Sequence, residues 1–302
     1  MSPYGKVAVL LGGTSSEREI SLKSGAAVLA ALRARGVDAH GVDAGRDLPA
    51  RLAEGYDRAF IALHGRLGED GCVQGLLEVM EIPYTGSGVA ASALAMDKRA
   101  TKALFRASAL STPDYRLVDT EADLASVAPL GFPLILKPVS EGSSIGVSRV
   151  ASAAALTEAF HKARAFGPVL AEACIVGPEY TCAILGDRAL PVIRLETPHD
   201  FYDYEAKYLL NTTRYHCPAG LTAERERAMQ ELAMEAFRAL GARGWGRVDI
   251  MADGAGRFYV LELNTVPGMT DHSLVPMAAR AAGLSFEDLV LEILSQTLEE
   301  TR

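Results

Sequence analysis

The chain has 302 residues, of which 49% are hydrophobic and 23% charged, so it is long enough for two domains or three lobes and too apolar for a disordered protein. Its 38 acidic and 30 basic residues give a formal net charge of −8, which disfavours binding to nucleic acid. Because the apolar runs are too short to span a membrane, the N-terminus has no signal-peptide pattern and the four cysteines lack metal-ligand spacing, we expect a cytoplasmic protein with reduced thiols and no membrane partner.

The N-terminal segment predicts an α/β lobe. Residues 6–11 form an apolar run that breaks at a glycine pair, which predicts a buried strand, a turn and then a helix. Ser16 and Glu19 fit a capping box at the start of that helix. A second strand is predicted at 58–63, before another glycine-rich turn. Since strands that alternate with helices form parallel sheets, we expect residues 1–95 to be an open lobe with a parallel sheet.

The middle segment, residues 96–177, predicts a second lobe of different character. Three short apolar runs are predicted as strands, at 133–137, 147–150 and 169–172. A helix is expected around 156–163, where apolar residues keep the helical period, with Ser152 as its cap.

The last segment, residues 178–302, predicts a third lobe. A hairpin is expected over 179–193, with its turn at Gly186-Asp187, and helices are expected over 222–240 and 285–298. Residues 198–220 keep neither a helix nor a strand period, and such long irregular segments are often lids or binding loops, although an aromatic surface loop is the alternative.

A second predicted hairpin, made of residues 246–251 and 258–264, gathers polar side chains. Because side chains alternate between the faces of a strand, the apolar residues of both strands are expected to face a core: Val248, Ile250, Leu261 and Leu263. If Asp253 pairs with Phe258 around the turn, the polar residues of the other face form two facing pairs, Arg247 with Asn264 and Asp249 with Glu262.

Two carboxylates and an amide oxygen that converge in this way predict a cation between them. Oxygen ligands suit magnesium, which takes few protein carboxylates and completes its shell with phosphate oxygens and water. The alternative is a surface salt-bridge ladder with Arg247. We favour the metal site, because Asn264 runs directly into Thr-Val-Pro-Gly268, a turn whose backbone amides can bind a developing oxyanion.

The loop Glu141-Gly-Ser-Ser-Ile-Gly146 follows the predicted strand that ends at Lys137. Its small residues leave backbone amides able to cradle a phosphate. The loop lacks the Gly-Lys-Ser/Thr ending of a P-loop, and an ordinary hairpin turn is the alternative. Together with the Lys137 charge and the predicted metal site, the loop favours binding of a nucleotide phosphate.

These motifs resemble the ATP-grasp superfamily and, within it, the D-alanine:D-alanine ligase family. The resemblance covers nearly the whole chain and rests on motifs in a fixed order, at 11–19, 64–71, 84–88 with 96–98, 141–146, 202–208, 244–249 and 262–276. It implies an α/β (α+β) ATP-grasp fold of three lobes, with nucleotide held between the central lobe, 96–177, and the C-terminal lobe, 178–302.

The resemblance also implies a reaction. ATP would phosphorylate the carboxylate of one D-alanine, and the amine of a second D-alanine would attack the acyl phosphate, for peptidoglycan precursor synthesis. Two alternatives stay open: an ATP-grasp ligase for another second substrate such as D-lactate, and a non-catalytic nucleotide-binding relative. A homodimer through the N-terminal lobe is a further family expectation.

By the same resemblance, Glu17 would hold the ammonium of the first substrate, and Ser143 with Tyr208 would link the lid over it. Ser273 would receive the carboxylate of the second substrate, and Arg247 with the Gly268 amide would stabilise the oxyanion. Two magnesium ions, or manganese, would bind Asp249, Glu262 and Asn264. The nucleotide contacts would be Lys98, Lys137, Ser144, Glu172, Ala173, Cys174, Ile175, Glu179, Phe201 and Lys207.

Several residues of the expected site depart from the family pattern or have another interpretation. Ala173-Cys174 stands where the family often has Lys-Trp, which weakens adenine stacking. Glu17 could be a helix-start carboxylate favoured by the helix dipole, and Ser273 could be a helix cap. His64 could either help at the first-substrate site or be fixed in a strand-end turn.

Overall fold

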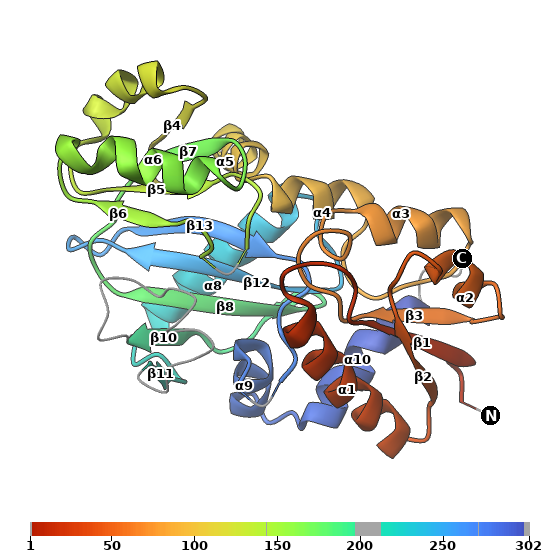
Figure 1. Ribbon diagram of the computed structural model, residues 1–302. Coiled ribbons are helices and arrows are strands. Elements are labelled where there is room, and N and C mark those ends of the chain that lie inside the picture. Colours follow the sequence, from red (N-terminus) through yellow and green to blue (C-terminus); the bar gives the residue numbers. More distant parts are fainter. Residues whose placement is uncertain (1, 143, 197–212, 271, 299–302) are drawn as a thin grey trace.

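Three β-sheets organise the part of the chain that the computed structural model describes, which is residues 2–142, 144–196, 213–270 and 272–298 (Figure 1). The first sheet is parallel and has the strand order β2-β1-β3. Its strands are β1 (Lys6–Leu11), β2 (Asp38–Asp43) and β3 (Arg58–Ile61). The predicted parallel sheet is therefore confirmed, with β1 at its expected residues.

Sequence reasoning missed β2. Its six residues, Asp-Ala-His-Gly-Val-Asp, include only two that are buried, Ala39 and Val42. A strand at the edge of a sheet has no continuous apolar run. The sequence pattern that identifies a buried parallel strand is therefore absent here. The capping box at Ser16 and Glu19 was also wrong, because α1 begins at Arg18, after Glu17, and no side chain caps it.

The second sheet is antiparallel, with the order β4-β7-β5-β6. Its strands confirm the three predicted in the middle segment and add one: β4 (Tyr115–Val118), β5 (Leu134–Pro138), β6 (Ser148–Val150) and β7 (Val169–Ala173). Helix α6 (Leu156–Arg164) packs against β5 and β7, and the short 3-10 helices η1 (Glu121–Leu130) and η2 (Ala153–Ala155) flank it. Ser152 precedes η2 and its side chain caps nothing.

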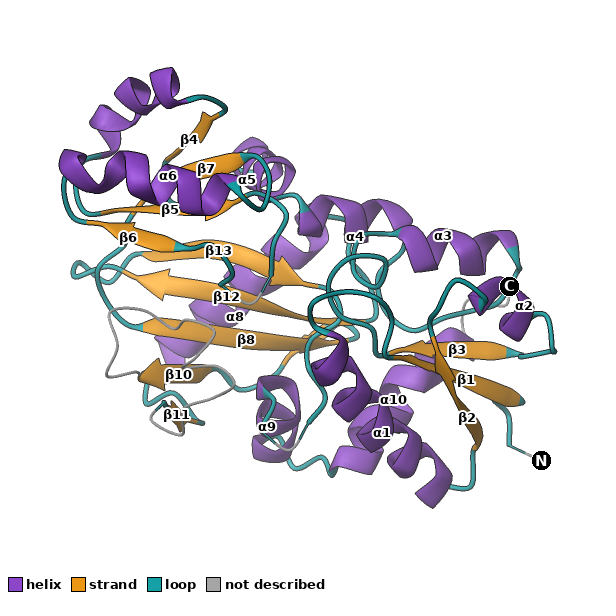
Figure 2. Ribbon diagram, in the orientation of Figure 1, coloured by secondary structure: helices purple, strands orange, loops and turns teal. Residues whose placement is uncertain are grey.

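The third sheet is antiparallel and follows the order β11-β10-β8-β12-β13, with β9 beside β8. Its strands are β8 (Glu179–Leu185), β9 (Arg188–Ala189), β10 (Ile193–Glu196), β11 (Arg214–His216), β12 (Trp245–Ala252) and β13 (Phe258–Asn264). Helix α8 (Ala223–Ala239) covers the face opposite the second sheet (Figure 2). The Thr222 side chain caps it by accepting the Arg225 amide, and the helix lies within the range 222–240 that the sequence predicted.

The remaining helices join the sheets into one body. They are α1 (Arg18–Ala34), α2 (Leu48–Leu52), α3 (Cys72–Val79), α4 (Val89–Met96), α5 (Lys98–Ala107), α9 (Leu274–Ala281), α10 (Phe286–Ser295) and η3 (Gln296–Leu298). Helix α10, from the end of the chain, packs on α1 beside the N-terminal sheet (Figure 1). Phe105 of α5 belongs to the same buried cluster as Val260 of β13. Segments far apart in the sequence therefore share cores.

All four cysteines are free thiols, as their spacing predicted. Within the described ranges, no helix is both long enough and apolar enough to cross a membrane.

Gly244 is where the loop before β12 meets the N-terminal lobe, and it supplies a stability test. Its φ is +78°, and a Cβ there would lie 3.0 Å from the Gly86 Cα. Gly241 has a similar φ of +66°, but a Cβ there would meet nothing within 4 Å. Gly241→Ala should cost about 1 kcal/mol of backbone strain, whereas Gly244→Ala should cost about 1–3 kcal/mol more because two backbones must separate. Thermal unfolding midpoints measure the difference, and equal midpoints for the two variants would contradict the contact.

Candidate active site

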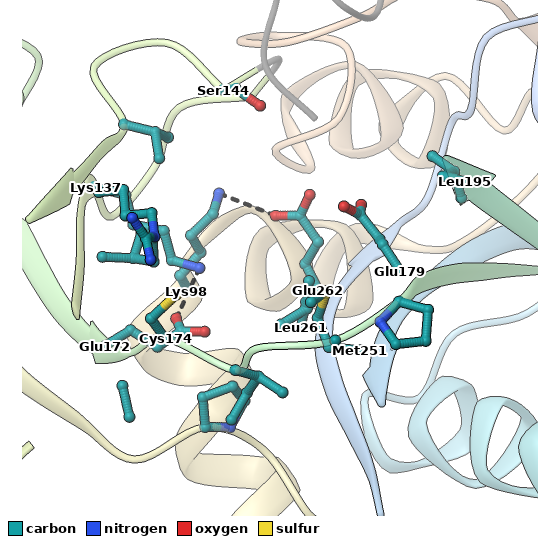
Figure 3. A pocket seen from close by; sticks show the side chains of 18 of the residues that line it. Lys98, Lys137, Ser144, Glu172, Cys174, Glu179, Leu195, Met251, Leu261 and Glu262 are labelled. Atoms are coloured by element: carbon teal, nitrogen blue, oxygen red, sulfur yellow. Dashed lines mark ion pairs between the residues drawn. The ribbon is translucent and has the colours of Figure 1, made fainter. Parts of the chain in front are cut away.

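A cavity of about 440 Å³ lies between the second and third sheets (Figure 3). Eight of the predicted nucleotide contacts line it: Lys98, Lys137, Ser144, Glu172, Ala173, Cys174, Ile175 and Glu179. They come from α5, β5, the loop after β5, β7, the loop after β7 and the start of β8. The other two, Phe201 and Lys207, lie outside the described residues, as do Ser143 and Tyr208.

The β12–β13 hairpin has the predicted register where it bears polar groups. Arg247 pairs with Asn264, and Asp249 pairs with Glu262. The expected pairing of Asp253 with Phe258 was wrong, since Phe258 pairs with Ala252. A β-bulge between the two regions shifts the register by one residue and so restores the facing pairs.

The bulge changes the direction of one side chain. Leu261 is the extra residue in β13, and it lines the cavity instead of the core to which we assigned it. Val260 takes the core position and is fully buried. An apolar wall is thereby placed beside Glu262, which projects into the same cavity (Figure 3).

Asp249 is the most tightly held of the predicted metal ligands. Arg247 donates to both carboxylate oxygens, from Nε and from Nη2, at 2.8 Å each. Thr181 Oγ1 donates at 2.6 Å and Asn264 Nδ2 at 3.1 Å. The salt bridge with Arg247 that we weighed as the alternative is therefore present. Thr181 was missed, although strand alternation places it on the cavity side of β8, opposite Asp249.

Glu262 faces a cation from another element. The Lys98 ammonium lies 3.4 Å from Glu262 Oε2, and it donates to the Glu141 carbonyl at 2.8 Å. Lys98 is the first residue of α5, whose N-terminus is fixed by the Asp97 side chain. The lysine thus joins the 141–146 loop to the hairpin.

The chemistry of the three predicted ligands fits a hard cation, because each offers a carboxylate or amide oxygen. Within the described part of the chain, no group of three or more His, Cys, Asp or Glu side chains is arranged to hold a metal. The predicted set has only two carboxylates. It therefore fits an ion that takes most of its ligands from phosphate and water.

The region around Glu17 is rich in acid. A Cβ added at Gly65 or at Gly142 would lie 2.8 or 3.3 Å from Glu17 Oε2, so two glycine backbones border this carboxylate. Burial and then Glu17 raise the pKa of Glu141. The same two causes raise the pKa of Glu69 to about 8. A hydrogen bond of 2.6 Å from the Gly65 amide to its carboxylate acts in the opposite direction and lowers the pKa. Sequence reasoning missed Glu69, although it lies within the 64–71 motif.

His64 is held from both ring nitrogens. Nδ1 lies 3.0 Å from the Val266 carbonyl and must donate to it, so Nε2 accepts from the Ser24 hydroxyl at 3.1 Å. Ser24 Oγ also accepts the Met269 amide at 3.1 Å. Burial lowers the pKa of His64, and the neutral ring fits this network. The contacts favour the strand-end interpretation, in which the histidine positions the turn that contains Gly268.

Ser273 occupies the cap position before α9, but its side chain does not cap the helix. Its hydroxyl accepts the Thr270 amide at 2.9 Å. A Cβ at Gly268 would lie 2.9 Å from Ser273 Oγ, so the hydroxyl and the Gly268 backbone are neighbours. The two groups assigned to the second substrate and the oxyanion are thus brought together.

Comparison with known proteins gives a consistent result. The family model described as D-ala D-ala ligase C-terminus matches residues 104–295, and the one described as D-ala D-ala ligase N-terminus matches residues 42–87. The chain is 59% identical over 299 residues to the D-alanine–D-alanine ligase of Stutzerimonas stutzeri, covering 98% of this chain and 95% of that protein. It is 60% identical over 294 residues to the one from Aromatoleum aromaticum, covering 96% and 95%.

Solved structures agree. The D-alanine–D-alanine ligase from Bacillus anthracis complexed with ATP superposes with a TM-score of 0.87 at 31% identity, over 98% of both chains. The VanG D-Ala:D-Ser ligase from Enterococcus faecalis gives 0.85 at 30% identity, over 97% of this chain and 99% of that one. The expected ATP-grasp fold is confirmed by the first of these.

Glu69 generates a pH prediction. Its carboxyl has an ordinary pKa of 4.5 that is raised to about 8 in the fold, so between these values the folded protein binds more protons than the unfolded chain. The contribution of Glu69 to the free energy of unfolding should be fully present below about pH 4.5. It should be lost as the pH rises through about 8. Thermal midpoints of Glu69→Gln minus those of the wild type should therefore increase from pH 5 to pH 8. Glu231→Gln, on the exposed face of α8, is the control, and a flat Glu69→Gln difference would refute the shift.

Proposed function

The chain belongs to the D-alanine–D-alanine ligase family, and we propose that it uses ATP to join two D-alanine molecules into D-alanyl-D-alanine for peptidoglycan precursor synthesis. The observation that carries this proposal is the cavity itself. It has lysines at 98 and 137 on one wall and Glu262 on the other, and the 141–146 loop runs from it to the neighbourhood of Glu17. A region that would bind phosphate and one that would bind an ammonium group therefore adjoin.

The first step forms an acyl phosphate. An oxygen of the first D-alanine carboxylate attacks the γ-phosphorus, and the bond to ADP breaks. Lys98 and Lys137 would neutralise phosphate charge as this happens. The ammonium of the same substrate would lie against Glu17, where neighbouring carboxylates make the potential negative. Glu141 is one such neighbour, whereas Glu69, whose pKa is raised to about 8, would add negative charge only when it ionises beside the ammonium.

The second step forms the peptide bond. The neutral amine of the second D-alanine attacks the acyl carbon, and phosphate departs with the electrons of the C–O bond and takes up the proton that the nitrogen loses. Arg247 and the Gly268 amide would stabilise the oxyanion of the tetrahedral intermediate. Ser273, which lies beside Gly268, would receive the second substrate's carboxylate.

Asp249, Glu262 and Asn264 would hold two magnesium ions, or manganese, which supply positive charge to the nucleotide phosphates. The facing register of these residues supports this assignment. Asn264 now turns its Nδ2 toward Asp249, and rotation of the amide would present its oxygen to an ion instead. Arg247 would keep Asp249 oriented, since it already binds both carboxylate oxygens.

The adenine and ribose would lie against residues 172–175 and Glu179, where β7 leads into β8. The short side chains of Ala173 and Cys174 line the cavity there, so the base would rest on a smaller surface than the Lys-Trp pair common in the family offers. The Glu172 carboxylate is occupied by lysines, which favours backbone contacts to the base.

The identity of the second substrate rests on the relatives. The fold alone does not decide it, since a D-Ala:D-Ser ligase shares it at a TM-score of 0.85. The relatives with 59% and 60% identity are named D-alanine–D-alanine ligases, which favours D-alanine over D-lactate. The oxyanion groups Arg247 and Gly268 favour a ligase over a nucleotide-binding relative without catalysis.

We further propose a cytoplasmic homodimer. The four free thiols suit a reducing compartment. On the N-terminal lobe, Val79 at the end of α3 is 84% exposed and Val89 at the start of α4 is 41% exposed. The family resemblance implies that the two copies meet on this lobe, where an interface would cover these valines.

The proposed function predicts that D-alanine alone stimulates release of phosphate from ATP in the presence of magnesium. Glu262→Gln should lower turnover by about 100-fold or more, because the phosphates lose a charged metal ligand, while the thermal midpoint stays close to that of the wild type. Glu287→Gln, a surface change in α10, is the matched control.

Dipeptide and phosphate are measured with each candidate second substrate. Turnover that requires D-lactate or L-alanine would reject D-alanine ligation, and unchanged turnover in Glu262→Gln would remove this residue from the metal site.

A further inference from the structure

Behind the cavity wall, one buried carboxylate is paired with two lysines. Glu172 is 3% exposed, and its Oε2 lies 2.7 Å from the Lys137 ammonium and 3.3 Å from the Lys102 ammonium. Burial alone would raise the pKa of Glu172, but the two lysines hold it below its ordinary value. The cluster thus contains two positive charges and one negative charge.

The two lysines differ in what they can reach. Lys137 lines the cavity, and its side chain is 12% exposed. Lys102 extends from α5, is fully buried, and does not line the cavity. The net positive charge of the cluster is therefore presented to the cavity by Lys137 alone (Figure 3).

Lys102 is fixed by three acceptors, which is as many as an ammonium has hydrogens. It donates to Thr112 Oγ1 at 2.7 Å, approaches the Pro113 carbonyl at 3.4 Å, and pairs with Glu172. Thr112 in turn donates to the Val260 carbonyl at 2.8 Å, beside the bulge in β13. Burial lowers the pKa of Lys102 to about 8, with Glu172 opposing that shift.

We propose that Lys102 is a positioning residue, which keeps Glu172 paired so that Lys137 can leave this carboxylate and bind a nucleotide phosphate. The proposal rests on the nucleotide site described above and adds a residue that does not touch the ligand. Lys102 acts through Glu172, and the ligand contact is made by Lys137.

The physical reason is the cost of a buried charge. If Lys137 moved to a phosphate and Glu172 had no other partner, the carboxylate would remain buried and uncompensated, which is strongly unfavourable. Lys102 removes that cost, because it stays on Glu172 while Lys137 moves. Without Lys102, the remaining pair is neutral, and binding of a phosphate must compete with Glu172 for the same ammonium.

The test compares ATP with adenosine, which has no phosphate. Affinities of the full chain for magnesium-ATP and for adenosine are measured by titration calorimetry in the wild type, Lys102→Met, Glu172→Gln and the double variant. In Lys102→Met the ATP affinity should fall by about tenfold or more while the adenosine affinity stays within about twofold, since only the phosphate contact is weakened.

The double variant provides the decisive comparison. Glu172→Gln removes the carboxylate that retains Lys137, so adding Lys102→Met to it should leave the ratio of ATP to adenosine affinity within about threefold of the wild type. A purely structural role would instead lower both affinities and would persist in the double variant. Three outcomes would overturn the proposal. They are a loss of both affinities in Lys102→Met, a lowered ratio that persists in the double variant, and an unchanged ratio in Lys102→Met.

Arg106→Met, four residues after Lys102 on the exposed side of α5, controls for loss of a cation from this helix. Thermal midpoints establish that each variant is folded. If Lys102→Met does not fold, Glu172→Gln alone decides, because its ratio of ATP to adenosine affinity should not fall.

Failure of the inference is distinct from failure of the proposed function. A wild type that makes D-alanyl-D-alanine with an unaffected ratio in Lys102→Met refutes only the role of Lys102.

Discussion

The antiparallel pairing of β12 with β13 is the constraint on which the rest of the site depends. It sets Asp249 against Glu262, and the bulge at Leu261 keeps that match although the turn is one residue out of register. A one-residue slip would send every side chain of a strand to the other face. The bulge therefore does two things: it holds the carboxylates together, and it turns an apolar side chain toward the cavity.

Charges of both signs line the cavity, and the lysines and the carboxylates near Glu17 lie toward different parts of the chain. Toward the second sheet lie lysines, of which Lys98 and Lys137 reach the cavity and Lys102 stands behind them. Toward the N-terminal lobe lie carboxylates, where Glu17 raises the pKa of Glu69 and of Glu141 as burial does. A substrate with a carboxylate at one end and an ammonium at the other would be oriented by this separation. Burial makes each group more effective, because water screens it less.

The turn that would bind the oxyanion is positioned from another lobe. Ser24 on α1 and His64 after β3 hold the backbone of Val266 and Met269 on either side of Gly268. Of the helices that follow this turn, α9 packs on β8 and α10, and α10 packs on α1 beside the N-terminal sheet. The turn around Gly268 is therefore held by the interface between the first and last parts of the chain, and the positions of the two lobes fix its geometry.

From the sequence alone, the strands at 6–11 and 133–137, the facing pairs of the hairpin and the family could all be predicted, because each depends on local periodicity or on a contiguous motif. The roles of His64, Glu69 and Lys102 could not. Each depends on partners more than 40 residues away or on burial, and strand alternation carries no information about either. Local pattern determined which groups the site contains, whereas only the packing of distant segments decided which of them are charged, which are neutral and which merely hold another in place.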